Sequence, residues 1–207
     1  MSVANMTTKQ WYRILIENNV TMQVQEGSVR ELIPVKCEVK NPLVNWDRTW
    51  SYTLMPGLGS EQKTFLFKML HNILPTKARL FRLQQSDSPI CSQCTSGNSE
   101  DCAHALLSCS FNTEEVNRWI RQVVNRVAPN INLQDIVTLN LDLDQTSAFP
   151  MVWFLSHTLS IVWQLRSSKK NINLHIIRAS LEAKINFLRK SRLSSRCEEI
   201  SDMIYLL

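Results

Sequence analysis

The sequence predicts a mainly α-helical protein, and two observations lead to that prediction. The chain has 207 residues but only 4 glycines, whereas β-rich folds tend to need glycine at their turns. Several segments carry apolar residues at spacings of three and four, which is the period of an amphipathic helix. A hydrophobic fraction of 44% and a charged fraction of 20% are close to the averages of globular domains.

Residues 1–56 are expected to form an N-terminal linker region with one helix and one extended segment. Apolar residues fall on one face of a helix over residues 7–19. Apolar and polar residues partly alternate over residues 32–39, which favours one short strand or hairpin. Pro34 restricts that segment to a sheet edge or to an irregular extended stretch, because proline cannot donate a ladder hydrogen bond.

Two helices are expected before the cysteine-rich segment. The first spans residues 60–72, where an apolar stripe includes Phe65 and Met69, and Pro75 follows its end. The second spans residues 76–83 and is basic. After the cysteines, helices are predicted over residues 114–127, 151–168, 174–193 and 195–206, with a polar loop over 130–145.

Four residues have the spacing of a metal site: Cys91 and Cys94 are separated by two residues, His104 follows after nine and Cys109 after four. A C-x2-C pair forms a tight knuckle, and zinc favours four sulfur and nitrogen ligands in a tetrahedron. A short helix is expected over residues 100–107. Positions five apart lie about 140° apart around an ideal helix, so the chain is expected to unwind before Cys109.

The pattern favours one structural Zn2+ ion, which makes the predicted architecture a helical domain with a small CCHC zinc knuckle. Four protein ligands close the shell and leave no position for an activated water. Glu100 and Asp101 are interpreted as helix-start charges. Cys102 is interpreted as a buried apolar residue rather than a competing ligand. The alternative is a set of buried free thiols beside a surface histidine.

These motifs resemble a known family. An aromatic-rich helix ends at Leu-Pro75-Thr, the C-x2-C knuckle follows, and His104-Ala-Leu-Leu-Ser-Cys109 closes the pattern. This order is similar to the reverse-transcriptase zinc-binding domain of LINE-type non-LTR retrotransposon polyproteins. The specific resemblance covers residues 57–112, and all four metal ligands carry over. Residues 113–207 resemble, more loosely, the helical basic C-terminal tail of such polyproteins.

The net charge of +5 is unevenly distributed, with nine Lys/Arg residues and a single acid between positions 160 and 196. Such an excess predicts a polyanionic partner, although a solvated helix face is the alternative. The cations expected to contact nucleic-acid phosphates are Lys77, Arg79, Arg82, Arg166, Lys169, Lys170, Arg178, Lys184, Arg189, Lys190, Arg192 and Arg196.

The expected function is a zinc-stapled nucleic acid-binding module that contacts the RNA or DNA backbone. The sequence has no Tyr/Phe-x-Asp-Asp polymerase signature and no nuclease carboxylate set, so an enzyme is not expected. Two alternatives are a protein-interaction scaffold that packs on a reverse transcriptase domain, and an inactive retrotransposon relic. No membrane partner is expected, and the predicted location is intracellular, in the nucleus or cytoplasm.

Overall fold

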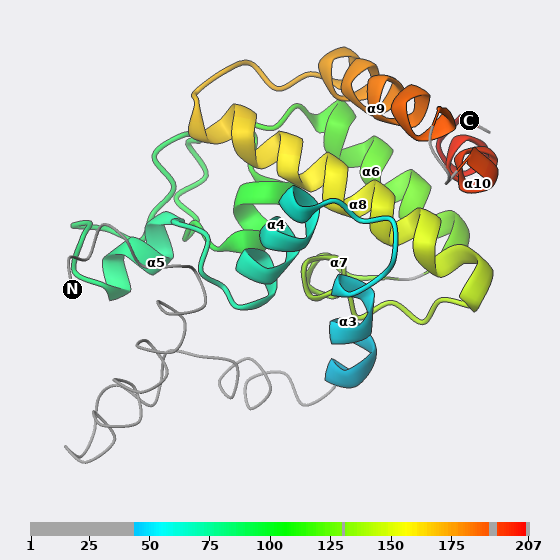
Figure 1. The fold of residues 1–207 in the computed structure, drawn as a ribbon. Helices are drawn as coiled ribbons and strands as arrows, with labels where there is room; N and C mark the ends of the chain where they lie inside the picture. Colours follow the sequence, from blue (N-terminus) through cyan, green and yellow to red (C-terminus); the bar gives the residue numbers. More distant parts are fainter. Residues whose placement is uncertain (1–43, 130, 191–193, 206–207) are drawn as a thin grey trace, which may run out of the picture. The chain divides into compact units, whose positions relative to one another are not determined.

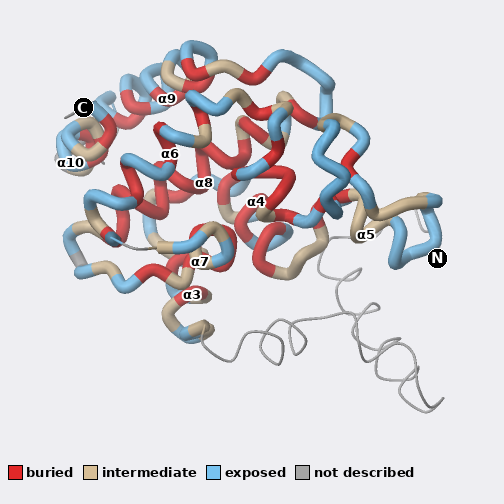
Figure 2. The backbone as a smooth tube through the Cα atoms, turned by 180° about the vertical axis from the view of Figure 1, so that it is seen from behind, coloured by how far each residue is buried: buried red, intermediate tan, exposed pale blue. Residues whose placement is uncertain are grey.

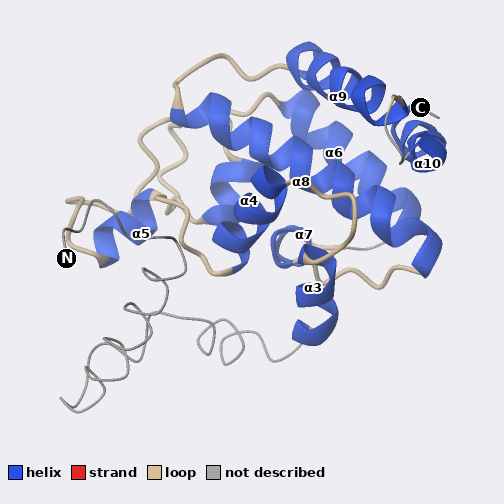
Figure 3. Ribbon diagram, viewed as in Figure 1, coloured by secondary structure: helices blue, strands red, loops and turns tan. Residues whose placement is uncertain are grey.

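The computed structural model describes residues 44–129, 131–190 and 194–205. Within these ranges the ordered elements are helices, apart from an isolated antiparallel bridge between Ile90 and Ser99 (Figure 3). The mainly α prediction is therefore confirmed. The helix predicted over residues 7–19 and the strand predicted over 32–39 lie outside the described residues.

The helices follow one another along the chain with short connections, apart from the long segment 83–103 between α5 and η3 (Figure 1). They are α3 (Trp46–Thr53), α4 (Ser60–Leu70), α5 (Lys77–Arg82), the π-helical turn η3 (His104–Ser108), α6 (Glu114–Val127), α7 (Leu133–Thr138), α8 (Gln145–Ser167), α9 (Leu174–Arg189) and α10 (Ser194–Tyr205).

Three helix starts differ from the prediction, and a polar cap explains each. α3 forms in the region interpreted as linker, α7 forms within the predicted loop, and α8 begins before Pro150 rather than after it. The side chains of Asn45, Asn132 and Asp144 each accept a hydrogen bond from the backbone N–H three residues ahead. Such a cap satisfies a helix-end donor, and these same polar residues are typical of loops in a sequence.

α8 is the central helix of the fold. It crosses the middle of the described residues, with α9 and α10 along one side and α3 and α7 on the opposite side (Figure 1). Every residue from 151 to 160 is buried (Figure 2). A helix that is apolar around its whole circumference must be enclosed by its neighbours, which is what α4, α9 and α10 do.

One hydrophobic core joins the described helices other than α5, which has no buried residue. It includes Leu66 of α4 and Leu106 of η3 together with Phe154 of α8 and Ile200 of α10. The chain from Leu43 onward forms one compact unit. The predicted regions 57–112 and 113–207 therefore share a core, so the metal-binding segment is packed against the C-terminal helices. No helix in the described ranges is both long and apolar enough to span a membrane.

His157 is a buried titratable group in the middle of α8. Its ring stacks on Trp153 with centroids 4.0 Å apart, and its Nδ1 donates to the Trp153 carbonyl at 2.9 Å. Burial lowers the pKa of His157 to about 4; the Trp153 carbonyl opposes this effect and Lys184 adds to it. The neutral ring is therefore the form that the fold accommodates.

This lowered pKa predicts an acid-sensitive component of stability. The unfolded chain titrates His157 near pH 6.5, so the stabilisation is complete above that pH and is lost as the pH falls toward 4. We expect His157 to account for a loss of about 2 kcal/mol in the free energy of unfolding between pH 7 and pH 5. Urea unfolding of the parent and of His157→Gln at both pH values measures this difference. An identical pH dependence in the two proteins would contradict it.

Candidate metal centre

A short hairpin presents the first two cysteines. The Cys91 N–H donates to the Asn98 carbonyl and the Glu100 N–H to the Pro89 carbonyl, each at 2.9 Å. These bonds flank the Ile90–Ser99 bridge and enclose the knuckle that carries Cys94. Gly97 lies in the turn with a φ of +71°, a left-handed conformation that glycine adopts without strain. The hairpin therefore returns the chain toward the second pair of ligands.

A π-helical turn presents the other two ligands. The Asp101 carboxylate accepts a hydrogen bond from the His104 N–H at 2.7 Å and so caps the turn. The Cys109 N–H then donates to the His104 carbonyl at 2.8 Å, an i to i+5 bond. The expected departure from an ideal α-helix before Cys109 takes the form of this π-helical turn, which ends at Ser108. The turn takes in one extra residue, which brings residues five apart to the same side.

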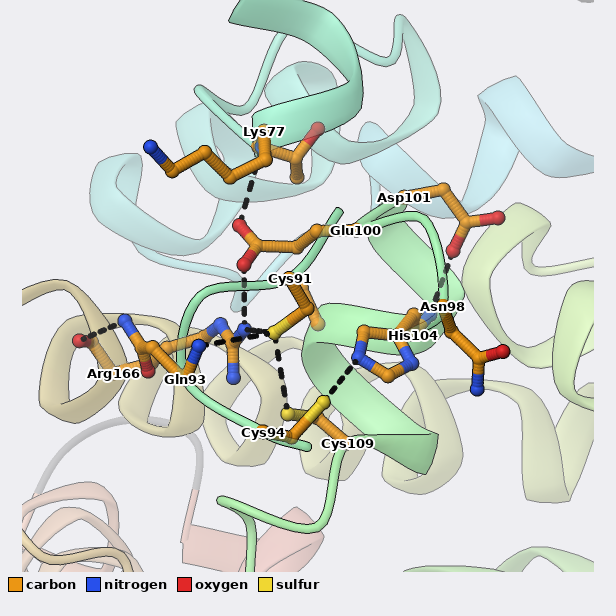
Figure 4. A network of polar contacts seen from close by, with 12 residues as sticks. Lys77, Cys91, Gln93, Cys94, Asn98, Glu100, Asp101, His104, Cys109 and Arg166 are labelled. Atoms are coloured by element: carbon orange, nitrogen blue, oxygen red, sulfur yellow. Dashed lines mark hydrogen bonds and ion pairs between the residues drawn. The ribbon is translucent and has the colours of Figure 1, made fainter. Parts of the chain in front are cut away.

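The four predicted residues meet at one point (Figure 4). Their ligand atoms all lie within 4.8 Å of one another. The Sγ atoms of Cys91 and Cys109 are 3.7 Å apart, and Cys94 Sγ is 3.4 Å from His104 Nε2. Zinc–ligand bonds of about 2.3 and 2.0–2.1 Å in a tetrahedron give ligand separations of about 3.8 and 3.6 Å. The cluster could therefore hold a metal ion, and zinc fits it.

The buried guanidinium of Arg166 contacts one of these ligands. Arg166, in the last turn of α8, is only 1% exposed. Its Nη2 donates to Cys91 Sγ at 3.0 Å and to Glu100 Oε2 at 2.8 Å (Figure 4). Hydrogen bonds to a thiolate stabilise it and fix its orientation. Arg166 was predicted to contact phosphate, but its burial and its two partners place it inside the protein.

Glu100 joins the metal centre to two helices. Its Oε2 pairs with Arg166 of α8, and its Oε1 accepts a hydrogen bond from the Lys77 N–H at the start of α5 (3.2 Å). The Ala78 N–H donates to the Glu100 carbonyl at 3.1 Å. The interpretation of Glu100 as a helix-start charge is therefore wrong, because it is Asp101 that caps the turn. No motif in the sequence indicated the link between Glu100 and Arg166.

The two knuckle thiols have opposite pKa shifts. Burial raises the pKa of Cys91 to about 11. The pKa of Cys94 is lowered to about 6, chiefly because the Ser96 hydroxyl hydrogen-bonds to its sulfur at 3.0 Å. Metal binding must therefore displace a proton from Cys91, and Arg166 favours that step by donating to the resulting thiolate.

Cys102 lies outside the ligand cluster. Its side chain is buried, and its Sγ donates to the Asn72 side-chain oxygen at 3.4 Å. The cluster of possible metal ligands found in the described residues contains Cys91, Cys94, His104 and Cys109 without it. Cys102 thus belongs to the packing between α4 and the ligand-bearing turn.

The other predicted phosphate contacts that the structure describes divide into two groups, and one further residue lies outside the described part of the chain. Arg178 and Arg196 lie over the rings of Trp119 and Phe149, at 5.4 and 4.3 Å from the ring centroids. Arg192 lies outside the described residues. The residues with exposed or half-buried side chains elsewhere on the surface are Lys77, Arg79, Arg82, Lys169, Lys170, Lys184, Arg189 and Lys190.

The fold and this ligand set define a helical CCHC metal-binding domain. Residues 7–115 match the family described as zinc-binding in reverse transcriptase. The match spans more than half of the chain, and the chain therefore belongs to this family. The matched region begins at residue 7, well before the motifs that start at residue 57. It ends at residue 115, so α7 to α10 lie beyond it. No curated protein and no solved structure is significantly similar to the chain.

Proposed function

We propose that the chain is a non-catalytic module that binds the nucleic-acid backbone and is held in shape by one structural zinc ion. The observation that carries the proposal is that two basic segments adjoin the metal centre. Glu100 contacts the start of α5, which bears Lys77, Arg79 and Arg82. Arg166 contacts Cys91, and Lys169 and Lys170 follow it along the chain.

The backbone fixes the second basic segment close to the metal centre. The Lys169 N–H donates to the Arg166 carbonyl and the Lys170 N–H to the Leu165 carbonyl, each at 2.9 Å. Lys169 has a φ of 53°. This is the Schellman arrangement that ends a helix, usually with glycine at the left-handed position. Both lysines are exposed.

Apart from Arg166, the cations beside the metal centre have no carboxylate partner among the described residues. The ion pairs found there involve Arg48, Arg118 and Arg166. The pKa of Arg79 is lowered, first by burial and then by the like charge of Arg82. A phosphate would relieve that repulsion, and such contacts position nucleic acid without reading its sequence.

The metal in this proposal has a structural role. Three cysteines and one histidine fill a tetrahedral shell, which leaves no open position for a substrate or an activated water. The ion holds the hairpin and the π-helical turn together, and through Glu100 and Arg166 this unit fixes α5 against α8. We infer that the module works beside a reverse transcriptase domain, since the family is named for that setting.

One observation favours a second function, a scaffold that docks on another protein domain. Ile176, Ala183 and Phe187 are exposed on one side of α9, and Phe187 is 72% exposed. Their spacings of seven and four place them on one helix face. A scaffold of this kind would associate through apolar surface, so its binding would depend little on salt.

The proposed function predicts a salt-dependent affinity that the lysines beside Arg166 control. Each phosphate contact contributes about 0.7–0.9 to the slope of log K against log salt. Replacing both Lys169 and Lys170 with Gln should therefore reduce the slope by about 1.5 and weaken binding similarly for all sequences. Titration of fluorescent RNA and DNA with the zinc-loaded chain at several salt concentrations measures the slope.

The matched control replaces Arg121 and Arg126 of α6 with Gln, which removes the same charge from exposed positions of another helix. We expect that control to retain the parent slope. Absence of binding by the parent, or equal slopes for the two double variants, would overturn the proposal. Salt-insensitive association with a polymerase domain would favour the scaffold.

A further inference from the structure

Four aromatic rings from α3, α4 and the residue that caps the end of α4 form a continuous row. The ring centroids of Trp46 and Trp50 are 5.8 Å apart, those of Trp50 and His71 are 4.9 Å apart, and those of His71 and Phe67 are 4.1 Å apart. The angles between successive ring planes are 28°, 34° and 46°. We call these residues the aromatic row.

The outer end of the aromatic row is open to solvent. Phe67 is 39% exposed, whereas the other three rings are half-buried. Trp50 packs against the hydrophobic core, which anchors the row. Burial lowers the pKa of His71, so its ring is neutral at pH 7 and offers an uncharged π face. A planar ligand could extend the stack at Phe67 without rearrangement of the core.

Three cations belong to the same part of the fold as this open end. Lys63 precedes Phe67 by one helical turn and Lys68 follows it directly, while Arg79 Nη1 donates to the Asn72 carbonyl at 3.0 Å. The Arg79 guanidinium therefore lies beside Asn72, the residue that follows His71 in the sequence. None of these cations belongs to an ion pair of the described residues. The nearby helix starts carry one acid each, Glu61 in α4 and Asp47 in α3.

An open π face beside cations that have no ion-pair partner among the described residues is a combination that suits single-stranded nucleic acids. Their bases stack on aromatic side chains, and their phosphates attract the neighbouring charges. In a duplex the bases are stacked on one another, so a protein ring cannot reach their faces without unstacking them. The charge argues against an apolar protein segment as the occupant, because such a segment would desolvate Lys68 and Arg79 without supplying an opposite charge.

We propose that the aromatic row is a binding site for an unpaired nucleic-acid strand, in which a base stacks on Phe67 and adjacent phosphates contact Lys68, Arg79 and Arg82. This inference rests on the proposed nucleic acid binding and deepens it. It specifies a single strand as the ligand and assigns base contact to a surface separate from Lys169 and Lys170. Because every base has a π face, the site holds any sequence.

The test compares Phe67→Ala with Phe187→Ala, which removes another exposed phenylalanine from α9. Affinities are measured for three fluorescent oligonucleotides of equal phosphate number: a single strand, an abasic strand and a blunt duplex. We expect Phe67→Ala to weaken single-strand binding about five- to tenfold, the low end of the range for one stacked base. Abasic and duplex binding should be unchanged, and Phe67→Trp should retain parent affinity. Thermal unfolding checks that the variants are folded.

The outcomes separate this inference from the proposed function. If the parent binds none of the three ligands, the proposed function fails. If the parent binds all three with similar salt slopes and Phe67→Ala does not change any affinity, the aromatic row is not a base-stacking site and backbone binding stands. Equal losses for the single strand, the abasic strand and the duplex would also overturn the stacking inference. A loss of binding to a protein domain only would reassign the row to protein docking.

Discussion

Removal of the metal ion is expected to unfold the segment around residues 89–112 and to lower the free energy of unfolding by several kcal/mol. The hairpin in this segment has only two bridging backbone hydrogen bonds, and the π-helical turn spans five residues. Their arrangement depends on the four ligands meeting at one ion. Structural zinc sites contribute about 10–16 kcal/mol of apparent binding free energy in small peptides, much of which serves to fold the site.

Hydrogen exchange and thermal unfolding measure this effect in the zinc-loaded chain, the chelated chain and a Cys91→Ser, Cys94→Ser variant. We expect amides between residues 89 and 112 to lose protection in the last two, while α8 retains more of it because its buried residues pack on several helices. Cys102→Ser is the matched control, since Cys102 lies in the same segment but outside the ligand cluster. Unchanged protection in the double variant would contradict the prediction.

Arg166→Met is expected to destabilise the zinc-loaded chain by about 3–5 kcal/mol, because it leaves Glu100 buried without its charge partner. The same change removes a donor from Cys91 and should weaken zinc binding about 10- to 100-fold, as loss of a group that supports a metal ligand commonly does. Glu100→Gln is expected to act in the same direction.

A double-mutant cycle isolates the pair. Arg166→Met combined with Glu100→Gln should cost less than the sum of the two single changes, because the second change removes the charge that the first left unpaired. Denaturant unfolding at constant zinc concentration gives the four free energies. The exposed pair between Arg118 and Glu114 provides the control, and Arg118→Met should cost no more than about 0.5 kcal/mol. Strict additivity for the buried pair would show that Arg166 and Glu100 act independently.

The sequence predicted the elements whose signal is local. The helices seen over Ser60–Leu70, Glu114–Val127 and Leu174–Arg189 have apolar residues at helical spacing, and that spacing places a stripe toward the core whatever surrounds it. α7 falls within the predicted loop because a six-residue helix has too few turns to show a period. Its start depends on the Asn132 cap, and asparagine is equally common in loops.

The metal ligands could be predicted because zinc chemistry restricts both the residue types and their spacing over a short segment. The π-helical turn could not be predicted, because two requirements determine it together. The local sequence favours an α-helix, whereas a shared metal site requires His104 and Cys109 to lie on the same side of the chain. Arg166 could not be distinguished from the surface cations near it, since its partner Glu100 lies 66 residues away. Burial of a charge is decided by tertiary packing, which no local pattern records.

X-ray absorption spectroscopy at the zinc edge on the purified chain, with metal content measured on the same sample, tests the central claim most directly. We expect one zinc per chain with three sulfur ligands at about 2.3 Å and one nitrogen ligand at about 2.0–2.1 Å. His104→Cys should convert that shell to four sulfurs if His104 is the nitrogen ligand. A chain that purifies without zinc in chelator-free buffer, or a shell dominated by oxygen, would contradict the assignment of Cys91, Cys94, His104 and Cys109 as its ligands.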